Sequence, residues 1–191
     1  MKHLIPLLYI CCVENTNLQY DAVINSCKDL FLKKTKDYGT SWRVMRTISI
    51  TDQIFIKALR IRTIQEKKVQ LVNDDLYSEF IGIINYAAIG IIQLKLNNAE
   101  IEDLPVETTE LYYSEAIKFA KDTMLNKNHD YGEAWRNMSE ESMVDLILVK
   151  IARIKQILQN DGKTIVSEGI DANFTDILNY SVFSLILAGK F

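Results

Sequence analysis

The chain has 191 residues and a formal net charge of −3; 48% of its residues are hydrophobic and 25% are charged. This balance is typical of a globular protein whose core needs neither disulfides nor metal to hold together. The absence of a basic excess argues against binding to polymeric nucleic acid, although a small anionic ligand needs only a few local cations.

The N-terminal segment has an apolar run, Leu4–Val13, that is broken only by Pro6. Such a run resembles the start of a signal peptide, but no small-x-small cleavage site follows it. We therefore expect residues 1–18 to form an apolar leader or an arm that lies on the folded unit. The chain has three cysteines, an odd number that favours reduced thiols in a cytoplasmic protein over a disulfide framework.

The rest of the chain repeats itself with a period of about 93 residues. Asp37-Tyr38-Gly39 matches Asp130-Tyr131-Gly132, and each turn is followed three residues later by one of the two tryptophans. Further matched pairs are Tyr20 and Tyr113, Lys34 and Lys127, Lys57 and Lys150, Arg60 and Arg153, and, after a slip of one residue, Asn85 and Asn179 with Tyr86 and Tyr180. We infer an internal duplication with a first repeat at 19–96, a linker at 97–107 and a second repeat at 108–191.

Each repeat is predicted to contain three helices, because apolar residues recur at helical spacing. The expected ranges are Tyr20–Lys34, a helix from near Thr51, and Asp75–Leu96, followed by Glu110–Asn126, a helix from near Glu140, and Glu168–Ala188. The glycine of the Asp-Tyr-Gly turn ends the first helix of each repeat, since it tolerates positive φ. The third helices are apolar on most sides but too interrupted to indicate a membrane span. We therefore predict an all-α fold, in which duplicated three-helix units form one pseudo-twofold bundle around the third helices.

Two cations lie one turn apart on the second helix of each repeat, within an apolar run. They are Lys57 and Arg60 in the first repeat and Lys150 and Arg153 in the second. A cation in such a run must reach water, a carboxylate or a bound anion, because leaving it buried and unpaired is costly. The sequence leaves two alternatives open, an internal salt bridge and a phosphate clamp.

Acidic residues on the third helices are the candidate partners of these cations or ligands of Mg²⁺, which prefers oxygen atoms. The duplication has divided these acids between the repeats, because Gly82 stands at the position of Asp176, and Asn173 at the position of Glu79. Either one site has decayed, or one composite site uses both repeats. The predicted metal ligands are Glu168, Asp171, Asp176 and Glu79.

The Asp-Tyr-Gly-x-x-Trp turn places aromatic residues beside an arginine in each repeat. One interpretation is local packing after a helix end. The other is stacking on a nucleotide base while the arginine contacts phosphate. The residues concerned are Tyr38, Trp42 and Arg43 in the first repeat and Tyr131, Trp135 and Arg136 in the second.

The paired Asp-Tyr-Gly-x-x-Trp-Arg segments, the Lys-x-x-Arg-Ile helices and the Asn-Tyr pairs resemble the nucleotide-modification-associated domain family in a two-copy bacterial form. The resemblance runs from about Gln19 to the end and implies a role connected with nucleotide or DNA-base modification. A more distant similarity is to the all-α nucleoside triphosphate pyrophosphatases of the MazG and dimeric dUTPase kind, which hold Mg²⁺ with acidic helix residues. Asp176 matches the last acid of their Glu-x-x-Asp motif, but Asn173 stands at the partner position, which departs from that pattern.

Our leading hypothesis is a nucleotide-binding protein with Mg²⁺-dependent pyrophosphohydrolase-like chemistry, in which Asp176 and Glu168 are catalytic. The alternative is a non-catalytic helical binding or assembly module whose acids and bases satisfy one another. We expect a nucleotide or other small phosphorylated ligand, no polymeric nucleic acid, no membrane span, and consider a homodimer. The predicted substrate-binding residues are Lys150, Arg153, Tyr131, Trp135 and Arg136, with Lys57, Arg60, Tyr38 and Trp42 in the first repeat.

Overall fold

The structure is a computed structural model that describes the backbone of residues 6–96 and 103–191, and side chains from residue 15 onward within these ranges. The described chain folds into six α-helices and two short 3-10 helices, with no strand among these residues. The prediction of an all-α fold is confirmed. Residues 1–5 of the predicted leader and 97–102 of the predicted linker lie outside the described residues.

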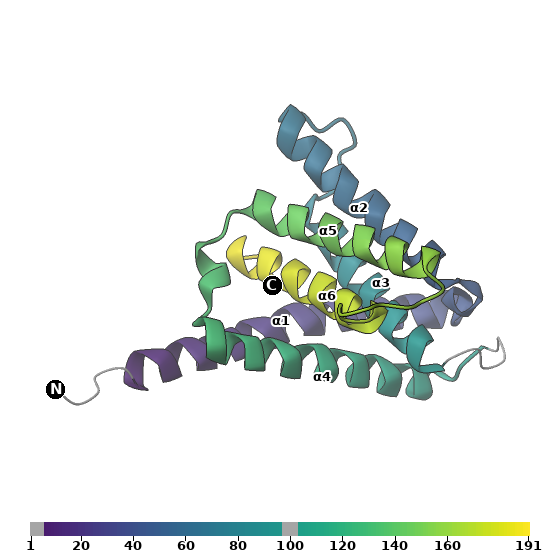
Figure 1. Cartoon of the computed structure of the whole chain (residues 1–191), viewed down its shortest axis with the longest axis horizontal. Coiled ribbons are helices and arrows are strands. Elements are labelled where there is room, and N and C mark those ends of the chain that lie inside the picture. Colours follow the sequence, from purple (N-terminus) through teal and green to yellow (C-terminus); the bar gives the residue numbers. More distant parts are fainter. Residues whose placement is uncertain (1–5, 97–102) are drawn as a thin grey trace.

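The helices occur in the same order in both repeats (Figure 1). The backbone from residue 6 onward belongs to the first helix, which therefore begins well before Tyr20, and the second helix begins one turn before Thr51. The first repeat has α1 (Pro6–Tyr38), η1 (Ser41–Val44), α2 (Thr47–Lys67) and α3 (Tyr77–Leu96), and the second has α4 (Val106–Tyr131), η2 (Ala134–Asn137), α5 (Glu140–Gln159) and α6 (Ile170–Leu187).

The predicted glycine turn ends the first helix of each repeat. Gly39 has a φ of +66° and Gly132 a φ of +61°, a left-handed conformation that glycine adopts without strain. The backbone N–H of each glycine donates 2.9 Å to the carbonyl four residues earlier, which closes the helix end. This turn directs the chain into η1 or η2, where Trp42 lies near Phe31 of α1 and Trp135 stacks on Phe183 of α6.

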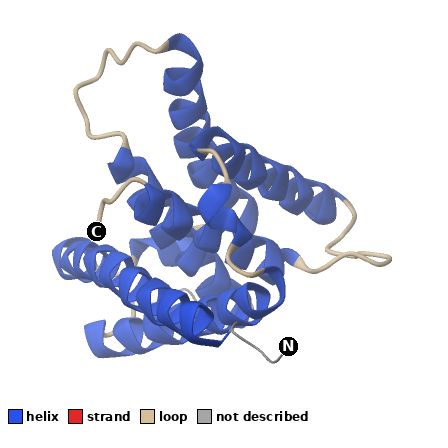
Figure 2. Cartoon of the chain, turned by 90° about the vertical axis from the view of Figure 1, so that its left-hand side faces the viewer, coloured by secondary structure: helices blue, strands red, loops and turns tan. Residues whose placement is uncertain are grey.

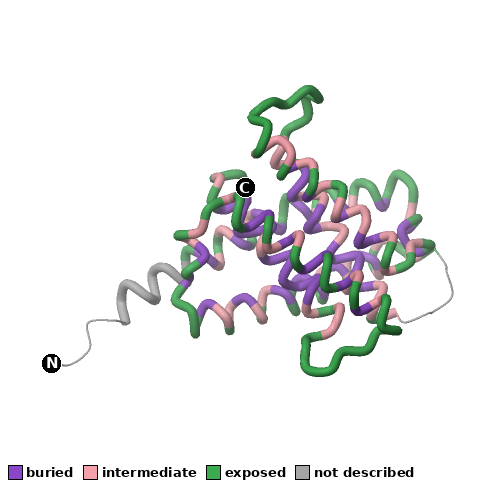
Figure 3. Tube along the Cα trace, turned by 45° about the horizontal axis from the view of Figure 1, so that its top comes forward, coloured by how far each residue is buried: buried purple, intermediate pink, exposed green. Residues whose placement is uncertain are grey.

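The six helices form three layers of two, with α3 and α6 in the middle (Figures 1 and 2). The long helices α1 and α4 lie side by side on one face of this central pair, and α2 and α5 lie on the other. Figure 3 shows the buried residues along the inside of this arrangement. Gly90 allows α3 to approach α6 closely, because a Cβ atom there would lie 2.7 Å from the ring of Phe174. The central pair therefore supplies a larger share of the core than either outer pair, in agreement with the prediction from the apolar third helices.

A reciprocal pair of hydrogen bonds shows the pseudo-twofold relation at atomic detail. The hydroxyl of Tyr20 donates to Asn179 at 2.9 Å, and the hydroxyl of Tyr113 donates to Asn85 at 2.8 Å. Each asparagine also donates to a backbone carbonyl of the first helix of its own repeat, at 3.0 and 3.2 Å. Since each asparagine joins the first helices of both repeats, the two repeats build one bundle with a shared core.

By length and composition, α3 is the one helix of the described chain that could cross a membrane. In the bundle, however, 56% of its apolar window is buried against other helices. The apolar composition of α3 is therefore that of a core helix.

Candidate functional site

In the second repeat, Asp176 of α6 lies between two lysines. Its Oδ2 is 2.5 Å from Nζ of Lys150 on α5, and its Oδ1 is 2.6 Å from Nζ of Lys127 on α4. Asp176 and Lys150 are buried, whereas the side chain of Lys127 is 45% exposed. Burial lowers the pKa of Lys127, but the hydrogen bond to Asp176 and the negative charges of Asp176 and Glu168, with a further contribution from Tyr180, together raise the pKa above its ordinary value. Both carboxylate oxygens of Asp176 are therefore already engaged by ammonium groups.

In the first repeat, Glu79 of α3 has the corresponding role one turn earlier on its helix. Its Oε2 is 3.0 Å from Nζ of Lys57, and its Oε1 accepts a hydrogen bond from Arg60. Burial raises the pKa of Glu79, but the hydrogen bonds from Lys57 and Arg60 outweigh burial and hold the pKa below its ordinary value. Arg60 also lies 3.9 Å from a carboxylate oxygen of Asp74, so for these predicted cations the structure shows the internal salt bridge.

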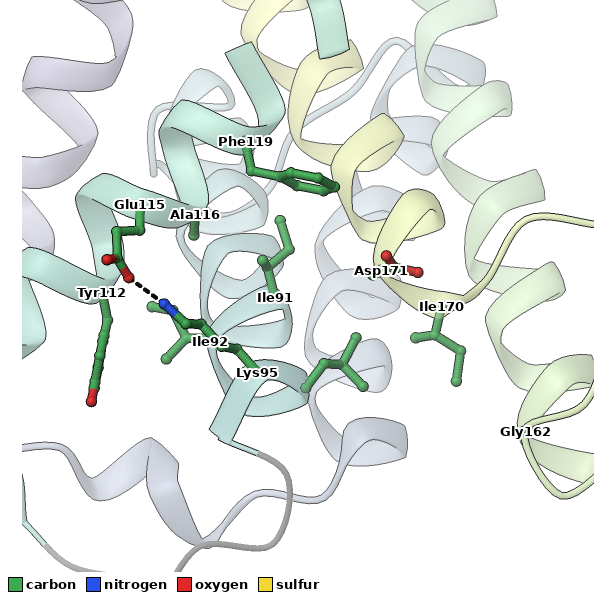
Figure 4. Close-up of a pocket in the computed structure, with 11 residues that line it drawn as sticks. Ile91, Ile92, Lys95, Tyr112, Glu115, Ala116, Phe119, Gly162, Ile170 and Asp171 are labelled. Carbon is green, nitrogen blue, oxygen red and sulfur yellow. Dashed lines mark hydrogen bonds and ion pairs between the residues drawn. The ribbon is translucent and has the colours of Figure 1, made fainter. Parts of the chain in front are cut away.

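The other predicted metal ligands do not join Asp176. Glu168 lies with Arg153 beside a hollow of 650 Å³ under the loop before α6. Asp171 faces a different, mostly apolar groove between α3, α4 and α6, where Lys95 pairs with Glu115 (Figure 4). Within residues 15–96 and 103–191, no three His, Cys, Asp or Glu side chains come together in a way that could hold a metal ion. The described carboxylates therefore do not fit the Mg²⁺ site that we predicted from Glu168, Asp171, Asp176 and Glu79.

The two arginines that follow the tryptophans are held by the protein itself. Arg43 is buried and donates to Gln93, whose amide donates in turn to the carbonyl of Arg43 at 3.0 Å. Arg136 donates to Glu133 at 2.7 Å and to Gln19 at 2.8 Å, and its guanidinium lies 4.4 Å from the ring centre of Trp135. These contacts fasten η1 to α3 and η2 to α1. Phosphate binding by Arg136 stays a prediction.

The first repeat encloses a cavity of 410 Å³ between α1, η1, α2 and α3. Its wall includes two lysines, Lys34 and Lys57, and its lining contains no Asp or Glu among the described residues. Trp42 is 8% exposed, and its indole N–H has no hydrogen-bond partner within the described structure. The remaining lining residues are Leu30, Phe31, Thr35, Tyr38, Gly39, Ser41, Met45, Gln53, Ser78, Gly82, Asn85, Tyr86 and Ile89.

The cavity unites predicted site residues with others that we did not predict. Tyr38, Trp42 and Lys57 were predicted to bind substrate, and all three line it. Arg60 does not line the cavity, although it shares Glu79 with Lys57. Lys34 was missed as a site residue, although its match with Lys127 in the repeat was a usable signal. Of the predicted residues of the second repeat, Arg153 and Glu168 line the hollow of 650 Å³, whereas Lys150 and Trp135 line neither this hollow, nor the apolar groove, nor the cavity of the first repeat.

Comparison with known proteins identifies the family of both repeats. A family model described as Nucleotide modification associated domain 1 matches the chain twice, over residues 34–94 and 127–187. Each match begins at the lysine before the Asp-Tyr-Gly turn and ends in the third helix of its repeat. No curated protein and no solved structure matches the chain. The chain therefore belongs to the nucleotide-modification-associated domain family and carries two copies of its domain.

Proposed function

We propose that the protein binds a nucleotide in the cavity of the first repeat, with the phosphate beside Lys34 and Lys57 and the base against aromatic side chains. The observation that carries this proposal is a cavity lined by two lysines and several aromatic residues but by no carboxylate. The description of the family supports a nucleotide-related role.

The size of the cavity suits a single small ligand. Its 410 Å³ falls in the range of about 300–1,000 Å³ that is usual for sites of small molecules and cofactors. A mononucleotide fits such a volume, whereas a polymer needs an open groove. This agrees with a net charge of −3 for the whole chain, which does not favour a nucleic-acid backbone.

The two lysines are suited to an anionic group. Lys34 has no ion pair or hydrogen bond with any described residue, and Lys57 shares Glu79 with Arg60, so positive charge remains available at the wall. An ammonium group offers three donors, and a hydrogen bond between charged groups contributes about 1.5–3 kcal/mol. A phosphate within reach of both lysines would thus account for much of the affinity.

Aromatic residues provide the surface for the base. Trp42 forms part of the cavity lining near Phe31, with ring centres 6.5 Å apart, and Tyr38 and Tyr86 line the cavity as well. Stacking of a base on an aromatic side chain contributes about 1–3 kcal/mol. The indole N–H groups of Trp42 and Trp135 both lack a partner among the described residues, and at Trp42 a carbonyl or ring nitrogen of a base would supply an acceptor.

The proposal is for binding and does not include a hydrolytic step. Pyrophosphohydrolase-like chemistry requires carboxylates that are free to take a metal ion, and the oxygens of Asp176 and Glu79 are occupied by cations of the protein. Mg²⁺-dependent turnover therefore stays a prediction without a supporting site among the described residues.

Tryptophan fluorescence provides the test, because each repeat holds one tryptophan. In the Trp135→Phe protein, Trp42 is the sole emitter, and nucleoside mono-, di- and triphosphates are titrated in the presence of EDTA. We expect a saturable change with at least one nucleotide, and a loss of affinity of about tenfold or more in a Lys34→Gln background. The matched control, Lys127→Gln in the second repeat, should bind as before.

Two results would overturn the proposal. The first is a protein that shows neither a fluorescence change nor a thermal shift with any nucleotide at millimolar concentration. The second is release of phosphate or pyrophosphate when Mg²⁺ replaces EDTA, which would show that the protein turns its ligand over instead of only holding it.

A further inference from the structure

We infer that the second repeat carries the same site in a closed form, in which the Asp176 carboxylate takes the position that the ligand's phosphate takes in the first repeat. This inference rests on the proposed function and deepens it. It states which two lysines hold the anion and predicts one ligand per chain.

The first step is the equivalence of the lysines. Lys127 and Lys150, which hold Asp176 at 2.6 and 2.5 Å, are the counterparts of Lys34 and Lys57 in the repeat. The bundle therefore brings this pair of ammonium groups to one carboxylate in the second repeat. The same helices in the first repeat carry both lysines to the wall of the cavity.

The second step is the residue at the position of Asp176. In the first repeat this residue is Gly82, which has no side chain to offer. The side chain of Lys57 lies directly over it, since a Cβ atom at Gly82 would be 2.7 Å from Cε and 3.1 Å from Nζ of Lys57. In the first repeat the side chain of Lys57 thus takes the place of the Asp176 side chain, and the third helix offers no carboxylate there to Lys34. An anion held by both Lys34 and Lys57 would have to come from outside the protein.

The third step is the apolar end of the cavity. Phe183 of α6 is 7% exposed and stacks on Trp135, with ring centres 4.1 Å apart and planes 3° from parallel. Its counterpart Ile89 lines the cavity that Trp42 also lines. An aromatic ring of the protein therefore covers the face of the second tryptophan, where the proposed function places a base on the first.

The fourth step is the polar lining. Three residues that could hydrogen-bond a ligand in the first repeat are replaced by apolar residues in the second. These pairs are Ser41 and Ala134, Gln53 and Leu146, and Ser78 and Ala172. Donors and acceptors are needed where a polar ligand loses its water, and they are dispensable where the protein fills the site itself. The three differences, at Gly82, at Ile89 and in the polar lining, therefore all point to one open and one closed copy.

Isothermal titration calorimetry of the unaltered protein with the nucleotide that it binds gives the first readout. We expect one ligand per chain. Two equivalent ligands per chain would overturn the inference while leaving the proposed function intact. Binding of no nucleotide would overturn both.

The Gly82→Asp variant gives the second readout, because it introduces the internal anion into the first repeat. Lys57 is flexible and can turn to the new carboxylate as Lys150 does to Asp176, so the fold should survive, as far-UV circular dichroism would check. We expect affinity to fall by more than tenfold. Gly82→Asn, of nearly equal size but uncharged, should lose distinctly less. Unchanged affinity in Gly82→Asp, or equal losses in both variants, would contradict the role of Asp176 as an internal anion.

Discussion

Removing the negative charge of Asp176 should destabilise the protein severely although the shape of the side chain is kept. Asp176→Asn leaves Lys150, which is 8% exposed, without a carboxylate inside the bundle. Breaking a buried ion pair from one side costs about 3–5 kcal/mol, because the remaining charge is buried and uncompensated. We expect a loss of about 3 kcal/mol, at the lower end, since the amide oxygen still accepts one hydrogen bond. For a domain stabilised by about 5–15 kcal/mol this is a large fraction.

The neighbouring lysine provides the matched comparison. The side chain of Lys127 is 45% exposed, so Lys127→Gln leaves no buried cation behind, and Asp176 keeps its contact with Lys150. An ion pair this open to solvent is screened, and we expect a loss of about 1 kcal/mol or less. Urea unfolding followed by far-UV circular dichroism measures both variants, with equal m values as the condition for comparing them.

The order of the two losses tests the reasoning about burial. If Asp176→Asn unfolds within about 0.5 kcal/mol of the unaltered protein, Lys150 reaches water without its partner and the buried pair is not a structural lock. If Lys127→Gln costs as much as Asp176→Asn, the exposed lysine is the main partner of the carboxylate. Nucleotide binding by Asp176→Asn should be unchanged while the protein stays folded, since the proposed site lies in the other repeat.

Three further outcomes follow from burial and hydrogen bonding. The lowered pKa of Glu79 gives stability that is present above the ordinary glutamate pKa of about 4.3 and is lost as pH falls through the lowered folded-state pKa. In Glu79→Gln, the free energy of unfolding should therefore fall less steeply as the pH is lowered through this range. Cys27 is fully buried, and burial raises its pKa to about 12, so in a Cys11→Ser, Cys12→Ser protein a thiol reagent should label it only as fast as the bundle opens. Tyr20→Phe should lower the free energy of unfolding by about 1–3 kcal/mol in urea, because the buried amide oxygen that accepts its hydroxyl loses its partner.

Much of the fold could be predicted because its signals are local or repeated. The Asp-Tyr-Gly turn marks a helix end through the conformation of one glycine, and the apolar third helices indicate a central pair. The start of α2 was predicted one turn too late, at Thr51 instead of Thr47, because the first turn of that helix lacks a side-chain cap that a sequence would reveal. Ser139, by contrast, accepts a hydrogen bond from the N–H of Ser142 and starts α5 where a serine cap is expected.

The candidate site was harder to predict, because the acidic residues in the sequence pointed to the second repeat, whereas the cavity lies in the first. Acids gather before and along α6, so the second repeat attracted the prediction of a metal site. Where Glu168 and Asp171 lie depends on the loop that precedes α6 and on how that helix meets its neighbours, and periodicity along one chain does not determine either. The cavity is lined instead by Gly82 and Ile89, where the second repeat has Asp176 and Phe183. The exchange of Asp176 for Gly82 is visible in the sequence, but the sequence does not show that a cavity lies there.

A displacement of one carboxylate by a single helical turn explains why both lysines of the pair are held by an acid in the second repeat, whereas one lysine is left unpaired among the described residues of the first. On the third helix an acid at the position of Glu79 reaches both cations of the second helix, and it leaves Lys34 of the first helix unpaired among the described residues. An acid three residues later, as at Asp176, reaches the counterpart of Lys34 instead. Three residues shift a side chain by about 4.5 Å along a helix, enough to change which lysine is neutralised. Because the repeats share one core, the helices of both repeats are needed for the fold. The bundle can therefore tolerate a change in the position of this single charge, and under the proposed function that position decides whether a repeat binds its own side chain or a ligand.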